Sequence, residues 1–198
     1  MNDVTHLGFQ DIPMLSNIPN LVYLAPTTKE EYIAMLDWSI EQNEHPVAIK
    51  LPGGAMVSGR PVTKNFGDLN KYEVTQKGSK VALLGLGTFY SLANAVADEM
   101  KSELGIDATV INPYYITGLD EELLESLKAD HSVVVTIEDG ILDGGFGEKI
   151  ARFYGDSDMK VLNYGLKKEF LDRYDVEEVL KDNRLDAEMI AEDVKGLL

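Results

Sequence analysis

Cysteine is absent from this chain of 198 residues, and basic residues are scarce beside acidic ones. Without cysteine there is no disulfide, no thiolate nucleophile and no cysteine-ligated zinc site. Eighteen lysine and arginine residues stand against 34 aspartate and glutamate residues, which gives a formal net charge of −16. Because so acidic a surface repels phosphate backbones, we expect no nucleic-acid partner.

Long apolar runs are also missing. No stretch reaches the roughly 18 consecutive apolar residues of a membrane helix, and the first residues lack the basic and apolar regions of a signal peptide. We therefore expect no membrane partner and a cytoplasmic location. A composition that is 44% hydrophobic and 26% charged is ordinary for a globular chain of one or two domains.

The pattern of the first 57 residues predicts a β-α-β unit. Residues 21–25 and 46–51 are short apolar runs typical of strands, and Thr28-Lys-Glu-Glu31 has the form of a capping box that opens a helix through about residue 43. Such a unit implies parallel strands. Helical spacing predicts one buried face of this helix, formed by Tyr32, Ile33, Leu36 and Ile40. One helix and two or three strands make only half a sheet, so we expect this region to need a partner.

Residues 52–78 are rich in Gly, Pro and polar side chains and are interpreted as a linker, within which residues 72–76 could pair locally as a strand. From residue 80 onward, strands and helices alternate. The expected elements are strands at 81–86, 109–112, 132–137 and 160–164, helices at 89–104, 121–129 and 147–154, and one or two final helices. This alternation predicts an α/β fold with an open, mostly parallel sheet covered on both faces.

Few residues have obvious chemistry. His6 has a pKa suited to general acid–base work, although a lone histidine near a terminus is more often a surface residue. His45 and His131 are interpreted as structural, since no two histidines have metal-ligand spacing. Gly85-Leu-Gly87 follows a strand, but Tyr90 stands where a dinucleotide fingerprint has its third glycine, which favours a plain tight turn.

An acidic pair, Glu138-Asp139, ends a β-branched strand and precedes a glycine-rich turn. Sites in open α/β sheets lie at that edge of the sheet. The pair could bind a cation or act as acid and base. It could equally cap the following turn and dock against another domain, and the residues alone leave both interpretations open.

The order of these motifs resembles the 1-deoxy-D-xylulose-5-phosphate synthase and transketolase family. The opening segment matches the family's Thr-His-x-Gly, Asp-Ile, Ile-Pro-Asn and Ala-Pro pattern. The matching residues are Thr5, His6, Gly8, Asp11, Ile12, Ile18, Pro19, Asn20, Ala25 and Pro26. "HPVAIKLPGG", "VALLGLGTFYSLANAVADEM", "INPYYITGLDEELL" and "VVVTIEDGILDGGFGEKI" follow in family order, so the resemblance covers nearly the whole chain.

The resemblance implies three regions. Residues 1–57 correspond to part of a pyrimidine-binding domain, 58–78 to a linker, and 79–198 to the transketolase C-terminal domain, used for packing and dimerisation. It also implies thiamine diphosphate and Mg²⁺ in the complete enzyme, which would serve isoprenoid precursor biosynthesis. His6 would be the catalytic residue beside the cofactor's reactive carbon, and Asn2 and Asp3 would be substrate-binding candidates.

Several family features are missing. There is no Gly-Asp-Gly motif for Mg²⁺ and diphosphate, and the glutamate that activates the cofactor lies in a region this chain lacks. We therefore expect the chain alone to bind no cofactor and no metal and to be inactive. Where the synthase branch has Tyr-Pro-Arg-Gly, this chain has Leu51-Pro52-Gly53-Gly54, so Gly53 replaces the phosphate-binding arginine. Lys50 is the candidate substitute.

The sequence thus predicts the C-terminal portion of a thiamine-diphosphate-dependent transferase that condenses pyruvate with glyceraldehyde 3-phosphate. Its expected partners are the missing N-terminal half or subunit and a second copy of itself. Two alternatives remain open. One is a non-catalytic assembly or dimerisation module, and the other is the C-terminal subunit of a split transketolase.

Overall fold

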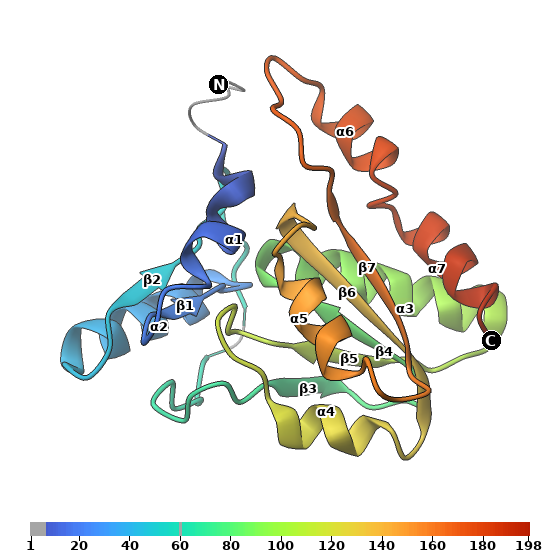
Figure 1. Cartoon of the computed structure of the whole chain (residues 1–198), viewed down its shortest axis with the longest axis horizontal. Helices are drawn as coiled ribbons and strands as arrows, with labels where there is room; N and C mark the ends of the chain where they lie inside the picture. The colour runs from blue at the N-terminus through green and yellow to red at the C-terminus, as the bar shows by residue number, and fades with distance from the viewer. Residues whose placement is uncertain (1–6, 60) are drawn as a thin grey trace.

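The computed structural model describes residues 7–59 and 61–198. Its strands form two separate sheets, a parallel pair near the N-terminus and a larger sheet of five strands (Figure 1). None of the helices in the described part of the chain is long and apolar enough to cross a membrane.

The small sheet is a β-α-β unit, as the sequence predicts. β1 (Val22–Leu24) pairs in parallel with β2 (Val47–Ile49), and α2 (Lys29–Glu41) connects them. The expected cap of α2 is confirmed, because Thr28 Oγ1 accepts a hydrogen bond from Glu31 N at 3.3 Å. Two short helices precede this unit, the 3₁₀ helix η2 (Gly8–Gln10) and α1 (Asp11–Leu15), neither of which the sequence pattern indicated.

The predicted buried face of α2 is wrong. Ile33, Leu36 and Ile40 are 49%, 37% and 72% exposed, and the buried positions are Glu31 and Met35. The helix turns this way because Asn112 Nδ2 and the backbone N–H of Thr27 donate to the Glu31 carboxylate, at 3.2 and 2.7 Å. The apolar stripe keeps its helical spacing but lies on the outer side of the helix.

The large sheet has the order β3-β5-β4-β6-β7. All neighbours are parallel except β3, which runs antiparallel to β5. Its strands are β3 (Glu73–Gln76), β4 (Lys80–Gly85), β5 (Thr109–Asn112), β6 (His131–Ile141) and β7 (Lys160–Leu166). The expected open, mostly parallel α/β sheet is confirmed. The expectation that residues 72–76 pair locally is wrong, since β3 is the edge strand of this sheet.

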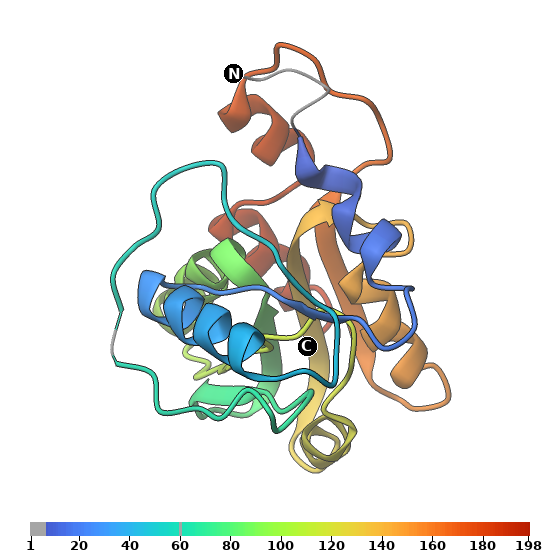
Figure 2. The ribbon, with the colours of Figure 1, turned by 90° about the vertical axis from the view of Figure 1, so that its left-hand side faces the viewer.

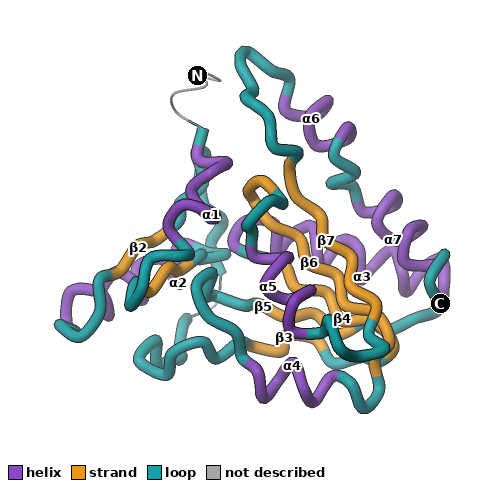
Figure 3. Tube along the Cα trace, viewed as in Figure 1, coloured by secondary structure: helices purple, strands orange, loops and turns teal. Residues whose placement is uncertain are grey.

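Helices cover both faces of the large sheet (Figure 3). They are η3 (Gly87–Phe89), α3 (Tyr90–Leu104), α4 (Glu121–Leu127), α5 (Phe146–Phe153), α6 (Val176–Asp182) and α7 (Ala187–Lys195). Alternate residues of β4 divide between two cores: Val81 and Leu83 pack with α3 and α7, while Ala82 and Leu84 pack with α4 and α5. This period of two is the pleat of a strand buried on both faces.

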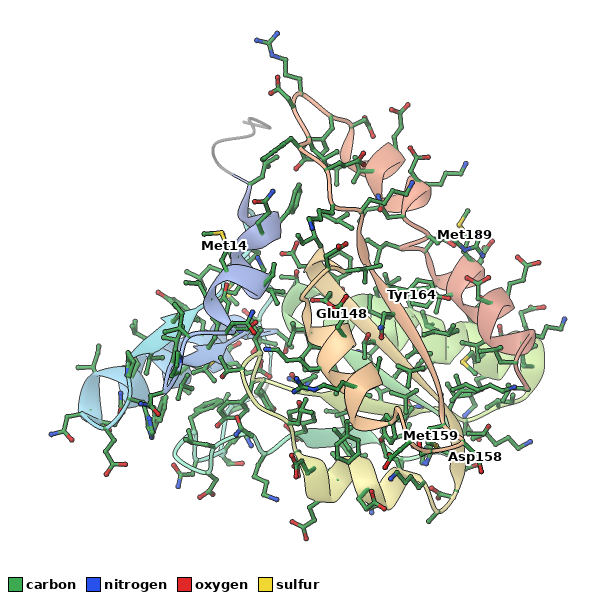
Figure 4. The ribbon with its side chains drawn as sticks, in the orientation of Figure 1. Met14, Glu148, Asp158, Met159, Tyr164 and Met189 are labelled. Atoms are coloured by element: carbon green, nitrogen blue, oxygen red, sulfur yellow. The ribbon has the colours of Figure 1, made fainter. Side chains whose placement is uncertain are left out.

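On the α7 side, a polar contact supplements the apolar core. Tyr164 belongs to β7 (Figure 4), and its hydroxyl donates to Asp193 Oδ2 of α7 at 2.8 Å. Asp193 also accepts from Arg184 Nη2 at 2.7 Å.

The two sheets are joined through β1. Ala25 N donates to Tyr114 O and Ile116 N donates to Tyr23 O, both at 2.8 Å, so the loop after β5 runs beside β1. One hydrophobic cluster continues from Val22 and Leu24 into the α4–α5 side of the large sheet. The small sheet is therefore packed against the large one rather than tethered by a free linker.

Candidate functional site

The segment that follows Thr5-His6 lies against the carboxyl end of β6. Figure 2 shows α1 crossing this end of the large sheet. A Cβ on Gly140 would come within 3.3 Å of Phe9 O and 3.1 Å of Ile12 Cδ1, and a Cβ on Gly144 within 3.1 Å of Pro13 Cβ. Glycine at 140 and 144 therefore lets the backbone of residues 8–13 approach the sheet closely.

The end of β6 is irregular at the same place. Ile137 pairs with Tyr164 and Ile141 with Leu166, so residues 138–140 leave the regular ladder. Bulges of this kind re-aim side chains and are common next to active sites. Here the irregularity separates the acidic pair, sending Glu138 and Asp139 to different partners.

Glu138 caps a helix inside the protein. It is fully buried, and its carboxylate accepts hydrogen bonds from Phe146 N at 2.8 Å and Gly147 N at 2.7 Å, at the start of α5. Burial raises the pKa of Glu138 from its ordinary 4.5 to about 7, against the opposing effect of these two N–H groups. Gly145 is required beside it, since a Cβ there would lie 2.6 Å from Glu138 Oε2.

Asp139 faces the small sheet instead. Its Oδ2 lies 3.8 Å from Lys50 Nζ, just beyond the end of β2. Lys50 Nζ also donates to Gly8 O at 2.9 Å, and its side chain is only 10% exposed. These contacts and those of Glu138 agree with the interpretation of the acidic pair as a cap and a docking group.

Aromatic side chains surround this junction. Tyr23, 2% exposed, has its pKa raised by burial and by the negative charges of Asp11 and Asp139. Phe9 packs on Tyr174 with ring centroids 6.0 Å apart. The junction thus combines the Lys50 ammonium group, the carboxylates of Asp11 and Asp139, and aromatic side chains. Together these groups hold the backbone that follows Leu7 against the large sheet.

Lys149 forms a second link between the parts of the chain. Its Nζ donates to Ile116 O at 3.1 Å and to Ser16 O at 3.4 Å, which connects α5 to the loop after β5 and to the end of α1. Burial lowers the pKa of Lys149 to about 8, while the negative charge of Glu138 opposes the change. Glu148, labelled in Figure 4, accepts from Gly144 N at 2.8 Å and closes the glycine turn.

The predicted site residues are only partly placed. Asn2, Asp3 and His6 lie outside the described residues, so their roles stay predictions. Lys50 lies at the junction just described. Its Nζ donates to the carbonyl of Gly8, which is two residues after His6 in the sequence. Gly53, where the family has arginine, lies in open space, because a Cβ there would meet nothing within 4 Å.

The remaining candidates have structural partners. His131 is buried, with Nε2 2.8 Å from Thr109 Oγ1 and Nδ1 3.1 Å from Leu127 O. At Gly85 a Cβ would lie 2.6 Å from Tyr90 Cα, which agrees with a tight turn packed on a helix. Within residues 7–59 and 61–198, no three His, Asp or Glu side chains gather to hold a metal ion.

A larger cavity lies elsewhere. It has a volume of about 770 Å³, opens between the start of α2, residues 61–64 and β3, and shares no lining residue with the pocket at Lys50 and Asp139. Lys64 lines the cavity, with its Nζ 5.1 Å from the ring centroid of Tyr114, and burial lowers the pKa of this lysine. Glu31, whose pKa burial raises, forms another part of the wall.

A comparison with known protein families identifies the family to which this fold belongs. Residues 70–190 match the family described as transketolase, C-terminal domain. The chain belongs to this family.

Full-length relatives share more than this domain. The chain is 33% identical over 196 residues to the 1-deoxy-D-xylulose-5-phosphate synthase of Clostridium tetani, and 34% identical over 198 residues to that of Crocosphaera subtropica. Each alignment covers 98% of this chain and 31% of the relative. The chain therefore spans about a third of the length of the curated relatives it matches, and the resemblance drawn from its motifs is confirmed.

Solved structures share the fold. A split gene transketolase, described as an inactive beta4 tetramer, superposes with a TM-score of 0.78 at 24% identity, over 98% of this chain and 62% of that one. A transketolase mutant from Pichia stipitis gives 0.73 at 18% identity, over 98% of this chain and 27% of the other.

Proposed function

We propose that this chain is the C-terminal portion of a thiamine-diphosphate-dependent transferase of the 1-deoxy-D-xylulose-5-phosphate synthase type. The complete enzyme joins pyruvate to glyceraldehyde 3-phosphate with loss of carbon dioxide, and this chain is inactive until a partner supplies the rest. The observation that carries the proposal is the alignment of 98% of the chain with only 31% of proteins of that name.

The proposal divides the chemistry between this chain and the missing N-terminal half or subunit of the same enzyme. The described residues provide no cluster of metal ligands, so they do not fit a Mg²⁺–diphosphate site. We assign thiamine diphosphate and Mg²⁺ to the partner and His6 to this chain, as the group that moves protons near the reacting atoms. Asn2 and Asp3 are the proposed substrate contacts, and Lys50 is a third candidate whose contacts with Gly8 and Asp139 favour the positioning role argued below.

The outer face of α2 supports the need for a partner. Ile33, Leu36 and Ile40 form an exposed apolar stripe on a helix that belongs to only a two-stranded sheet. A stripe at this spacing is typical of a helix face that packs against another element. The remaining part of the same enzyme is the occupant that the length comparison favours, and a second copy of this chain is the other outcome.

Binding measurements test this division. The chain is mixed with a candidate partner that aligns with the remaining two-thirds of the synthases, and the complex is measured by analytical ultracentrifugation. Ile40→Glu should weaken the complex roughly tenfold or more, because burial of an isoleucine contributes about 1.5–3 kcal/mol. Lys195→Gln, at an exposed position on α7, makes the same one-unit change in charge and should have no effect.

Calorimetry with thiamine diphosphate and Mg²⁺ completes the test. The mixture should bind the cofactor and this chain alone should not. Tight binding by the chain alone, or a complex indifferent to Ile40→Glu, would contradict the proposal.

A second candidate is the C-terminal subunit of a split transketolase with another sugar-phosphate acceptor. It is favoured by Gly53, which removes the arginine expected to hold substrate phosphate, and by the likeness in fold to a split gene transketolase. The assembly-module alternative differs from both in predicting a complex without activity.

A further inference from the structure

We propose that Lys50 and Asp139 form a positioning pair that fixes the backbone of residues 8–11, just after Thr5-His6, and that the catalytic work proposed for His6 depends on this pair. The inference rests on the proposed function of His6, and it assigns to the C-terminal domain a direct part in organising the active site. Neither residue needs to touch the reacting atoms for this role.

The first argument is the state of the Lys50 ammonium group. Its hydrogen bond to Gly8 O is 2.9 Å, Asp139 Oδ2 lies at 3.8 Å, and the side chain is 10% exposed. Gly8 O also accepts from Asp11 N, which closes η2. The lysine therefore clamps a carbonyl two residues after His6, and it is held by a charged group from the other sheet.

The second argument is that the surrounding backbone and glycine residues leave room for this contact. The irregular end of β6 frees Asp139 from the ladder, and Gly140 beside it leaves room for Phe9 O. A Cβ on Gly8 would overlap Asp11 Oδ2 and lie 3.4 Å from Lys50 Nζ, so a side chain at residue 8 would displace the Asp11 carboxylate.

The third argument is the short distance along the chain between the held backbone and His6. A backbone held at residues 8–13 leaves only Leu7 between the clamp and His6. Misplacement of a catalytic group by about 1 Å can cost on the order of 100-fold in rate. Loss of the clamp should therefore lower kcat while leaving substrate affinity nearly unchanged.

The test uses two independent readouts and matched controls. Lys50→Met, Asp139→Asn and Lys50→Arg are compared with Lys168→Met and Asp143→Asn. The control residues form an exposed pair, 3.5 Å apart, next to the same glycine turn. Amide hydrogen exchange of residues 7–11 is measured in the chain, and kcat and KM are measured in the assembled enzyme.

We expect Lys50→Met and Asp139→Asn to speed exchange of residues 7–11 roughly tenfold. Lys50→Met removes the charge-assisted hydrogen bond to Gly8 O, and Asp139→Asn removes the negative charge that holds Lys50 in place. In the assembled enzyme kcat should fall roughly 100-fold with KM for pyruvate changed less than twofold. Lys50→Arg should recover most of both, and the control pair should change neither.

Unchanged exchange in Lys50→Met and Asp139→Asn would overturn the inference, as would faster exchange with normal kcat. A raised KM with normal exchange would show that Lys50 contacts substrate instead. If the wild-type mixture is itself inactive while exchange responds as expected, the proposed function fails and the clamp on residues 7–11 stands.

Discussion

Replacement of Glu138 by glutamine should change how stability depends on pH. Glu138 is fully buried and its pKa is raised to about 7. In the unfolded chain the carboxyl group ionises near 4.5, so between pH 4.5 and 7 the unfolded state loses a proton that the folded state keeps. Stability from this group is full below pH 4.5 and is lost as pH rises through 7.

The magnitude follows from the two pKa values. The interval from 4.5 to about 7 corresponds to about 3 kcal/mol of unfolding free energy. Glu138→Gln has no such loss, but its amide can accept from only one of Phe146 N and Gly147 N, which costs about 1–3 kcal/mol at every pH. The variant should therefore be less stable than wild type at pH 4 and should gain on it by about 3 kcal/mol by pH 8.

Urea unfolding at constant ionic strength measures this difference. Circular dichroism follows the whole fold, and fluorescence of Trp38, the only tryptophan, follows α2. Glu121→Gln, at an exposed position in the first turn of α4, is the matched control and should track wild type across the range. Parallel curves for wild type and Glu138→Gln would refute the reasoning.

Two glycine positions give further predictions. Gly144→Ala and Gly105→Ala both place a side chain at positive φ, +71° and +65°, which costs about 1 kcal/mol. Gly144→Ala should cost more in urea unfolding, because only there does the new Cβ meet a neighbour, Pro13; equal losses would deny that contact. Gly53→Arg fits the open space, so in the assembled synthase it should lower KM for glyceraldehyde 3-phosphate roughly tenfold through a bidentate phosphate contact. An unchanged or higher KM would contradict the phosphate assignment.

The sequence pattern predicted the strands and helices of the large sheet well. Thr109–Asn112 has the expected bounds, because a buried β-branched run is a local signal. The small sheet shows the limit of such signals. Spacing located an apolar stripe on α2, but which side of a helix faces the core depends on tertiary partners, here the buried Glu31.

The sequence indicated which residues belong to the candidate site, but not which residues contact one another there. Glu138 and Asp139 were noticeable at a strand end, yet their separate roles depend on an irregular β–β register that no local pattern encodes. Lys149 was missed altogether, because an isolated lysine on an amphipathic helix is usually exposed. Its bonds to the carbonyls of Ser16 and Ile116 arise only when three distant segments meet.

The measurement that tests the central claim most directly is reconstituted catalysis. This chain and its candidate partner are assayed separately and together for pyruvate consumption with glyceraldehyde 3-phosphate, thiamine diphosphate and Mg²⁺. The account predicts activity only in the mixture, a loss of about 100-fold or more with His6→Ala, and full activity with His45→Ala. No activity from two folded halves, or equal activity with His6→Ala, would contradict it.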